Sequence, residues 1–230
     1  MKKLFLLFII TMSMTSLGQD TIQTSKGKHT VVGNNGTTYF DKDTSSAKQS
    51  KLKDSLQDVP LFYGIKIDGT YENFDRELKN KGFHFLEKVE NSNVYIYKGV
   101  FLSQSVELFV VVTPTTKLVW KVSVYFPEYS RSASWIEIKG DFISLKEQLT
   151  TKYGTPTDDF KFFSSPYNEG DGYEMTAVKI GKCSYFTAWS NNVKAVTLQI
   201  GEHSLKLSYE NSINAAKAKE EKQKINKNQL

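Results

Sequence analysis

Residues 182–209, KCSYFTAWSNNVKAVTLQIGEHSLKLSY, contain three strand-length runs separated by two tight turns. The runs are residues 182–189, 193–200 and 203–209, and the turns are Asn191-Asn192 and Gly201-Glu202. Leu205, Leu207 and Tyr209 alternate with polar residues, which is the pattern of a strand with one buried face. Connections as short as these join antiparallel neighbours. The stretch therefore predicts three strands of an antiparallel sheet.

A helix is expected before these strands. Phe142, Leu145 and Leu149 recur at helical spacing, Asp141 lies near the expected start, and Gly154 ends the helix. The strands expected between this helix and residue 182 are residues 160–163 and 172–180.

The same order of elements is expected about 70 residues earlier in the chain. Thr70 is a good N-cap for a helix over residues 71–81, in which Phe74 and Leu78 share one stripe and Gly82 marks the end. The strands expected after this helix are residues 83–89, 93–102, 106–112 and 117–126.

This order predicts an α+β fold made of two similar units, each a helix packed on an antiparallel sheet. Residues 19–59 are too poor in large apolar residues to stay ordered. Residues 212–230 favour a helix but have few apolar side chains that a helix could bury. The predicted segments are a signal peptide at 1–18, a flexible polar leader at 19–59, the first unit at 60–134, the second unit at 135–211 and a basic, frayed helical tail at 212–230.

Residues 1–18 have the three-part pattern of a bacterial export signal. Two lysines precede the apolar run 4–10, and Ser16 and Gly18 place small side chains at the positions that signal peptidase requires. The run is shorter than the roughly 20 apolar residues that span a bilayer. We therefore expect cleavage before Gln19 and a periplasmic or extracellular protein, with an uncleaved N-terminal anchor as the alternative. No transmembrane segment is expected after cleavage.

The positive charge of the chain is concentrated at its C-terminal end. The formal net charge is +5, of which Lys2 and Lys3 contribute two. Residues 213–230 hold five lysines and two glutamates, so this tail carries the remaining surplus and residues 19–212 are formally neutral. A nucleic-acid binder would spread a basic patch over its folded face. We therefore expect no nucleic-acid partner, and an unknown protein or envelope component instead.

The sequence predicts no catalytic, cofactor-binding or metal-binding residue. Cys183 is the single cysteine, so it cannot close an internal disulfide, and we interpret it as a strand residue that packs like a small hydrophobe. His29, His84 and His203 lack the spacing of metal ligands.

An acidic loop at residues 168–172, followed by Glu174, is the strongest candidate for a calcium site. Its glycines would permit the necessary bend, but it lacks the alternating aspartates of an EF-hand. We favour a solvated polar loop here, and we interpret Asp158-Asp159 in the same way.

One predicted strand carries aromatic residues on a single face. Tyr95, Tyr97 and Phe101 share this face, and aliphatic residues occupy the opposite one. The two faces cannot easily border one core. One interpretation is an exposed binding face formed by the three aromatic residues. The favoured alternative is that a second layer covers them, either the other unit or the leader.

Residues 61–70, with Phe74, Leu78 and Gly82-Phe83, resemble the opening of a group of exported bacterial proteins of unknown function. Residues 145–156 are similar to the second helix of that group, and the resemblance covers roughly residues 61–211. The predicted plan also resembles the tandem helix-plus-sheet fold of β-lactamase inhibitor protein, in shape only. Such motifs are structural, so the resemblance implies no catalytic residues, and a shared fold does not fix function.

The expected function is a non-enzymatic binding or structural module of the bacterial envelope. The export signal, the repeated sheet units and the lack of a recognisable catalytic set support this expectation. The alternative is an envelope hydrolase whose active site forms from residues distant in the sequence, which a nucleophile and a base within hydrogen-bond reach would support.

Overall fold

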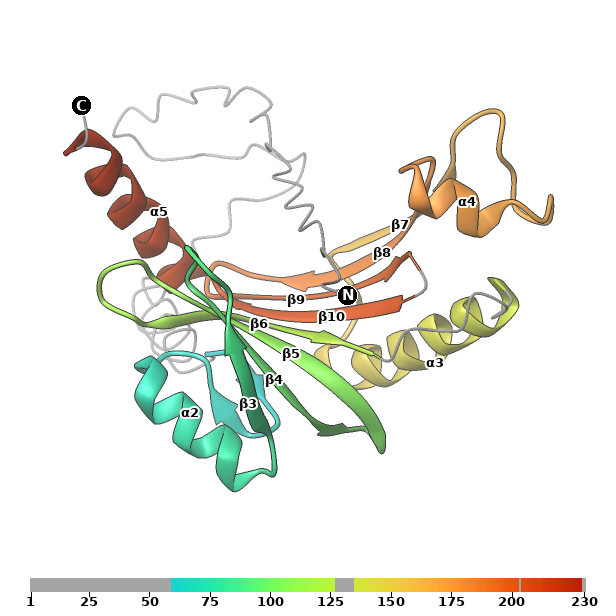
Figure 1. Cartoon of the computed structure of the whole chain (residues 1–230). Helices are drawn as coiled ribbons and strands as arrows, with labels where there is room; N and C mark the ends of the chain where they lie inside the picture. Colours follow the sequence, from blue (N-terminus) through green and yellow to red (C-terminus); the bar gives the residue numbers. More distant parts are fainter. Residues whose placement is uncertain (1–58, 127–134, 203, 229–230) are drawn as a thin grey trace, which may run out of the picture. The chain divides into compact units, whose positions relative to one another are not determined.

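The computed structural model describes residues 59–126, 135–202 and 204–228 (Figure 1). These residues form an α+β fold with one eight-stranded antiparallel sheet, one two-stranded sheet and four helices. Contacts divide the chain into residues 1–42 and 43–230, and every described residue belongs to the second part. The predicted signal peptide, the leader up to residue 58, His29 and His203 lie outside the described residues.

The elements before residue 127 are β1 (Leu61–Phe62), β2 (Ile65–Lys66), α2 (Tyr71–Asn80), β3 (His84–Lys88), β4 (Val94–Phe101), β5 (Gln104–Val112) and β6 (Val119–Tyr125). The elements from residue 135 onward are α3 (Trp135–Tyr153), β7 (Asp158–Phe163), α4 (Glu174–Lys179), β8 (Cys183–Ser190), β9 (Lys194–Gly201), β10 (Ser204–Asn211) and α5 (Ser212–Lys227).

The strands form one continuous sheet in the order β3-β4-β5-β6-β10-β9-β8-β7. All neighbouring strands are antiparallel, so the predicted strand direction is confirmed. The four strands that follow α2 meet the four that follow α3 where β6 pairs with β10. The sequence therefore places two strand groups beside each other in one sheet, with β3 and β7 at its edges.

Two predicted elements differ from the structure. The strand expected at residues 172–180 is wrong, because Glu174–Lys179 forms the short helix α4. Its Met175 and Val178, three residues apart, pack against the core, and Ala177 is fully buried. Helix α3 begins at Trp135, well before Asp141, because Trp135 and Ile138 extend the buried stripe toward the N-terminus.

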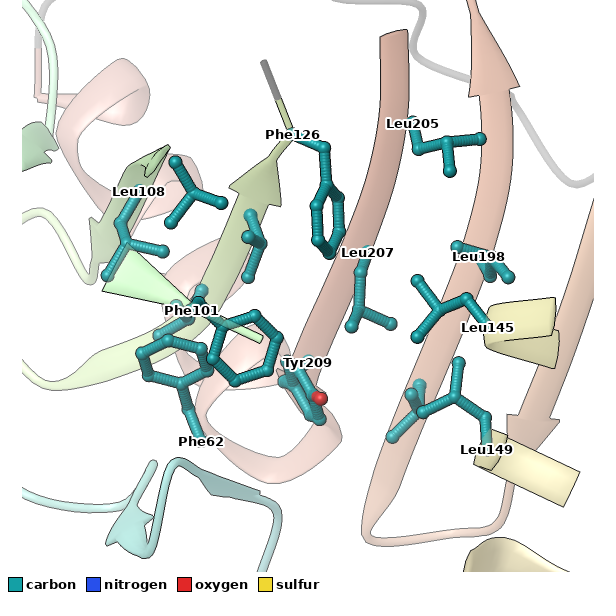
Figure 2. Close-up of a cluster of buried hydrophobic side chains, with 14 of the residues drawn as sticks. Phe62, Phe101, Leu108, Phe126, Leu145, Leu149, Leu198, Leu205, Leu207 and Tyr209 are labelled. Atoms are coloured by element: carbon teal, nitrogen blue, oxygen red, sulfur yellow. The ribbon is translucent and has the colours of Figure 1, made fainter. Parts of the chain in front are cut away.

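Helices α2 and α3 cover one face of the sheet, which we call the inner face. Phe74 and Leu78 are the buried residues of α2, and Leu145 and Leu149 are among those of α3. Figure 2 shows Leu145 and Leu149 directed toward leucines of β9 and β10, within the same buried cluster as Phe62, Phe101 and Phe126. The inner positions of β10 are all buried, as are those of β5 from Val106 onward and those of β9 from Val196 to Ile200. The apolar alternation seen in the sequence is thus the inner face of the sheet.

The C-terminal helix α5 is attached to the fold by polar contacts. Asn211 caps it by accepting from the amides of Ile213 and Asn214, and the Asn214 amide group donates to the Val119 carbonyl at 2.9 Å. Glu221 is buried and accepts from the Thr115 amide at 2.6 Å. The basic tail expected at residues 212–230 contains the helix Ser212–Lys227, and the two buried residues of this helix are polar rather than apolar.

Replacing Glu221 by Ala is expected to release the end of α5. Its carboxylate also accepts from the Thr116 amide and hydroxyl, and losing partners for buried donors costs about 1–3 kcal/mol. Hydrogen exchange at pH 7 should show faster exchange of α5 amides in this variant. Glu220→Ala, at an exposed neighbouring position, is the control and should leave the exchange unchanged.

The contribution of Glu221 should also depend on pH. Burial alone would raise the pKa of Glu221, but hydrogen bonds from Thr116 and Thr115 lower it below the ordinary glutamate value. A lowered folded-state pKa means that the stabilisation is complete above the unfolded-state value, about 4.3, and is lost as the pH falls through the folded-state value. The difference between wild type and Glu221→Ala should therefore shrink in acid. A difference that stays constant down to pH values of about 2 would contradict this assignment.

Candidate binding surface on the outer face of the sheet

The face of the sheet turned away from α2 and α3, the outer face, differs from the inner face in exposure. In β5 and β9 the outer residues Phe109, Val111, Thr197 and Gln199 are only half-buried, although each lies between two buried inner neighbours. The same alternation places Lys206 on the outer face of β10. The outer face is therefore partly accessible on β5 and β9, while its small central residues Ser123, Ser208 and Ala188 are buried.

The strand register aligns the outer residues in rows that cross the sheet. The middle row contains Ile96, Phe109, Ser123, Ser208, Thr197 and Ala188. One flanking row contains Glu107, Tyr125, Lys206, Gln199, Phe186 and Phe160, and the other contains Val111, Lys121, Glu210, Ala195 and Ser190. Small side chains thus lie at the centre, with longer ones on either side.

Aromatic pairs lie on both halves of the outer face, one on β5 and β6 and the other on β7 and β8. The rings of Phe109 and Tyr125 are 4.7 Å apart between centroids, and those of Phe160 and Phe186 are 6.1 Å apart. Phe160 and Phe162, on the edge strand β7, are each 50% exposed. Aromatic residues are enriched at the centres of protein interfaces, where they bury large areas at little entropic cost.

The charges on the outer face have mixed signs. Lys121 and Glu210 form an ion pair at 3.2 Å between β6 and β10, and the Lys206 ammonium lies 5.2 Å from the ring centroid of Tyr125. In the centre, the hydroxyls of Ser123 and Ser208 hydrogen-bond to each other at 2.9 Å. The outer face therefore carries charges of both signs rather than a field of a single sign.

The aromatic row, for which an exposed binding face was one interpretation and a covering layer the favoured one, lies on the inner face. Tyr97 is fully buried and Phe101 nearly so, while Tyr95 is half-buried with its ring 3.7 Å from that of Tyr71 in α2. The Tyr97 hydroxyl donates to Asp75 Oδ1 at 2.7 Å. The exposed-face interpretation is wrong because α2 contacts Tyr95 and Tyr97. The rings of Phe62 and Phe126 pack against Phe101. A second layer covers the row, as the alternative held, and this layer comes from α2 and β1 of the same half.

Burial governs the chemistry of these inner hydroxyls. Burial raises the pKa of Tyr97, and its hydrogen bonds with Tyr71 and Asp75 act in the same direction. The Tyr97 hydroxyl therefore stays protonated and serves as a fixed donor beneath α2. Its role in the fold is to satisfy the polar groups at this contact.

Cys183 is a buried residue of β8, as predicted from its strand pattern. Burial raises the pKa of Cys183 to about 11, and the carboxylates of Glu169 and Glu174 act in the same direction. The thiol is therefore protonated at neutral pH and is a poor nucleophile.

The acidic loop at residues 168–172 directs its carboxylates to groups of the protein. Asp171 accepts from the amides of Asn168 and Tyr173, and Glu174 accepts from the Gly170 amide at 2.7 Å. Glu169 accepts from the Tyr185 hydroxyl at 3.0 Å and forms an ion pair with Lys139. Within the described ranges, no group of three or more His, Cys, Asp or Glu side chains has an arrangement that could hold a metal ion.

The remaining candidate groups are also placed by the structure. Asp159 accepts from Lys146 and Thr187, and although burial alone would raise its pKa, these hydrogen bonds lower it. His84 is exposed on the edge strand β3. In the part of the chain that the structure describes, no helix has both the length and the apolar composition needed to cross a bilayer.

Sequence reasoning missed the outer face. Its residues come from strands spread over the chain, from Ile96 to Glu210, and they become neighbours only through the pairing of β6 with β10. The sequence did contain a signal for this face, because in each alternating strand the more polar residues mark the face opposite to the core. Comparison of the chain with family models, with curated proteins and with solved structures finds no match.

Proposed function

We propose that this chain is a non-enzymatic binding module of the bacterial envelope, which holds a partner protein against the outer face of its eight-stranded sheet. The observation that carries the proposal is the partly accessible outer face, on which Phe109, Tyr125 and Phe186 are interspersed with polar and charged residues. Binding surfaces combine such aromatic anchors with polar groups that fix orientation.

The size of the outer face suits one protein partner. Eight strands spaced about 4.8 Å apart span roughly 34 Å, and eight residues of strand extend roughly 26 Å. The product is on the order of 900 Å², before allowing for the twist of the sheet. One partner in an interface of standard size contributes about 800 Å². A face of this area is also large for a small ligand, which is usually enclosed in a concave site.

We also propose that the protein is exported. The basic, apolar and small-residue segments of residues 1–18 support this part of the proposal. The rival interpretation, a hydrolase, draws no support from the described residues. There the single cysteine is buried with a raised pKa, and His84 lies alone on an edge strand.

We also infer that the two halves are copies of one unit. Each half has a helix followed by four antiparallel strands, α2 with β3 to β6 and α3 with β7 to β10. Leu78 and Leu149 occupy corresponding buried positions on the two helices. The insertion of α4 between β7 and β8 distinguishes the second half. Joining two such units through β6 and β10 produces an outer face twice as wide as one unit could offer.

Quantitative capture from envelope extracts tests the proposal, with the full chain as bait. The double variant Tyr125→Ala and Phe186→Ala should recover the partner at least about tenfold less well than wild type, because truncating aromatic anchors of an interface costs about 2 kcal/mol or more. The matched control is Ile136→Ala with Tyr173→Ala, at positions 78% and 62% exposed away from the outer face. Equal recovery by all three baits, or no specific protein with wild type, would reject the outer face as the binding surface.

A further inference from the structure

We propose that α5 is a basic arm that draws the protein to a bilayer rich in anionic phospholipid. The helix carries Lys217, Lys219, Lys222, Lys224 and Lys227, and all five are exposed. Only Glu220 and Glu221 oppose them within the helix. This surface is separate from the outer face, and the inference does not depend on the proposed partner protein.

The structure turns one of the two carboxylates of α5 away from solvent. Glu221 is turned into the loop between β5 and β6, where Thr115 and Thr116 supply three hydrogen bonds of 2.6, 3.3 and 2.6 Å. Glu220 is then the single exposed carboxylate of the helix, against five exposed ammonium groups. Among the described residues, none of the five lysines forms an ion pair with an acidic side chain.

The hydrogen bonds from Thr115 and Thr116 to Glu221, which we call the anchor of α5, determine the direction in which the lysines point. At about 100° per residue, Lys219, Lys222 and Lys227 lie on the side of α5 away from Glu221, while the other two flank it. Figure 1 shows α5 leaving the end of β10 and its C-terminal end pointing away from the sheet. The anchor therefore fixes a helix whose outward side is cationic.

A lipid surface suits this arrangement better than an acidic protein. The ammonium groups are distributed around more than half of the helix circumference, and a planar anionic surface attracts such a distribution without requiring matched partners. Ile213, in the first turn of α5, and Ile225, between Lys224 and Lys227, are 54% and 39% exposed, so apolar groups are available to the interface. Lysine side chains also extend apolar stems that lie well at a headgroup layer.

Vesicle sedimentation with the full chain tests the inference. Wild type should partition to vesicles of equal parts phosphatidylglycerol and phosphatidylcholine and much less to pure phosphatidylcholine, at about 0.15 M salt. Each lysine near an anionic surface contributes about five-fold in partitioning. The triple variant Lys219→Gln, Lys222→Gln and Lys227→Gln should therefore partition about a hundredfold less. These positions are exposed, so its thermal unfolding should match that of wild type.

The matched control removes the same charge from the body of the protein. Lys66→Gln, Lys152→Gln and Lys182→Gln also alter exposed lysines, and this triple variant should partition as wild type does. Because all variants share the same N-terminal residues, any contribution of that segment cancels. Equal losses in the two triple variants, or equal wild-type partitioning to both vesicle types, would overturn the inference. Binding to soluble polyglutamate without binding to anionic vesicles would overturn it in favour of an acidic protein.

Discussion

Leu149→Ala and Leu78→Ala should each lower the free energy of unfolding by about 2–5 kcal/mol, because each removes buried methyl groups and leaves a cavity. Leu78 is fully buried on α2, and Leu149 is 5% exposed on α3. Such a loss is a large part of the roughly 5–15 kcal/mol by which a domain is stable. If the two halves are copies of one unit, the two losses should also be similar to each other. Denaturant melts measure both.

The controls for these variants lie on the exposed sides of the same helices. Arg76→Ala and Gln148→Ala alter exposed residues, and each should cost less than about 0.5 kcal/mol. The hydrogen bond from Arg76 to Asn73 is itself exposed and contributes little. If Leu149→Ala were as harmless as Gln148→Ala, α3 would not hold the inner face of the second half, and the likeness of the halves would lose its main support.

Gly99→Ala should destabilise the fold by about 1–3 kcal/mol or more, as overpacking in a closed core does. Gly99 lies in β4 directly beneath the ring of Phe83, and a Cβ at this position would be 2.2 Å from Phe83 Cδ1. Phe83 is 1% exposed and its ring packs 5.9 Å from that of Phe62, so the ring cannot move aside freely. Glycine is therefore required here by the close approach of an aromatic side chain.

Gly140→Ala provides the contrasting change in the same assay. Gly140 lies exposed within α3, and a Cβ there would meet no atom within 4 Å. Alanine should therefore stabilise the helix by about 0.5–1 kcal/mol. Opposite signs for the two glycine variants are the expected result. A neutral Gly99→Ala would show that Phe83 does not cover β4 as the structure has it.

The sequence was most informative where structure is determined locally. The hairpins joining β8, β9 and β10 follow from short turns and strict alternation, and the apolar stripes of α2 and α3 follow from helical spacing. Helix α4 was missed because a six-residue helix shows too little periodicity to be distinguished from a strand. A helix can be inferred more dependably from a long periodic segment than from one as short as α4.

Long-range pairing could not be predicted from these patterns. The contact between β6 and β10 joins Lys121 to Glu210 and decides which residues share the outer face. The same limit applies to α5, whose anchor depends on Glu221 reaching threonines 105 and 106 residues away in the chain. The strand pattern also could not show what covers Tyr97, because an aromatic residue on a strand gives no indication of which helix will pack against it.

Site-specific photo-crosslinking in cells tests the central claim, that the outer face binds a partner protein, most directly. A photoreactive residue in place of Thr197, which lies half-buried in the middle row on β9, should form a crosslink to one protein of defined mass. The same residue in place of Ile136, 78% exposed on α3, is the control and should form none. A crosslink from position 136 but not from position 197, or from neither position, would contradict the proposed role of the outer face.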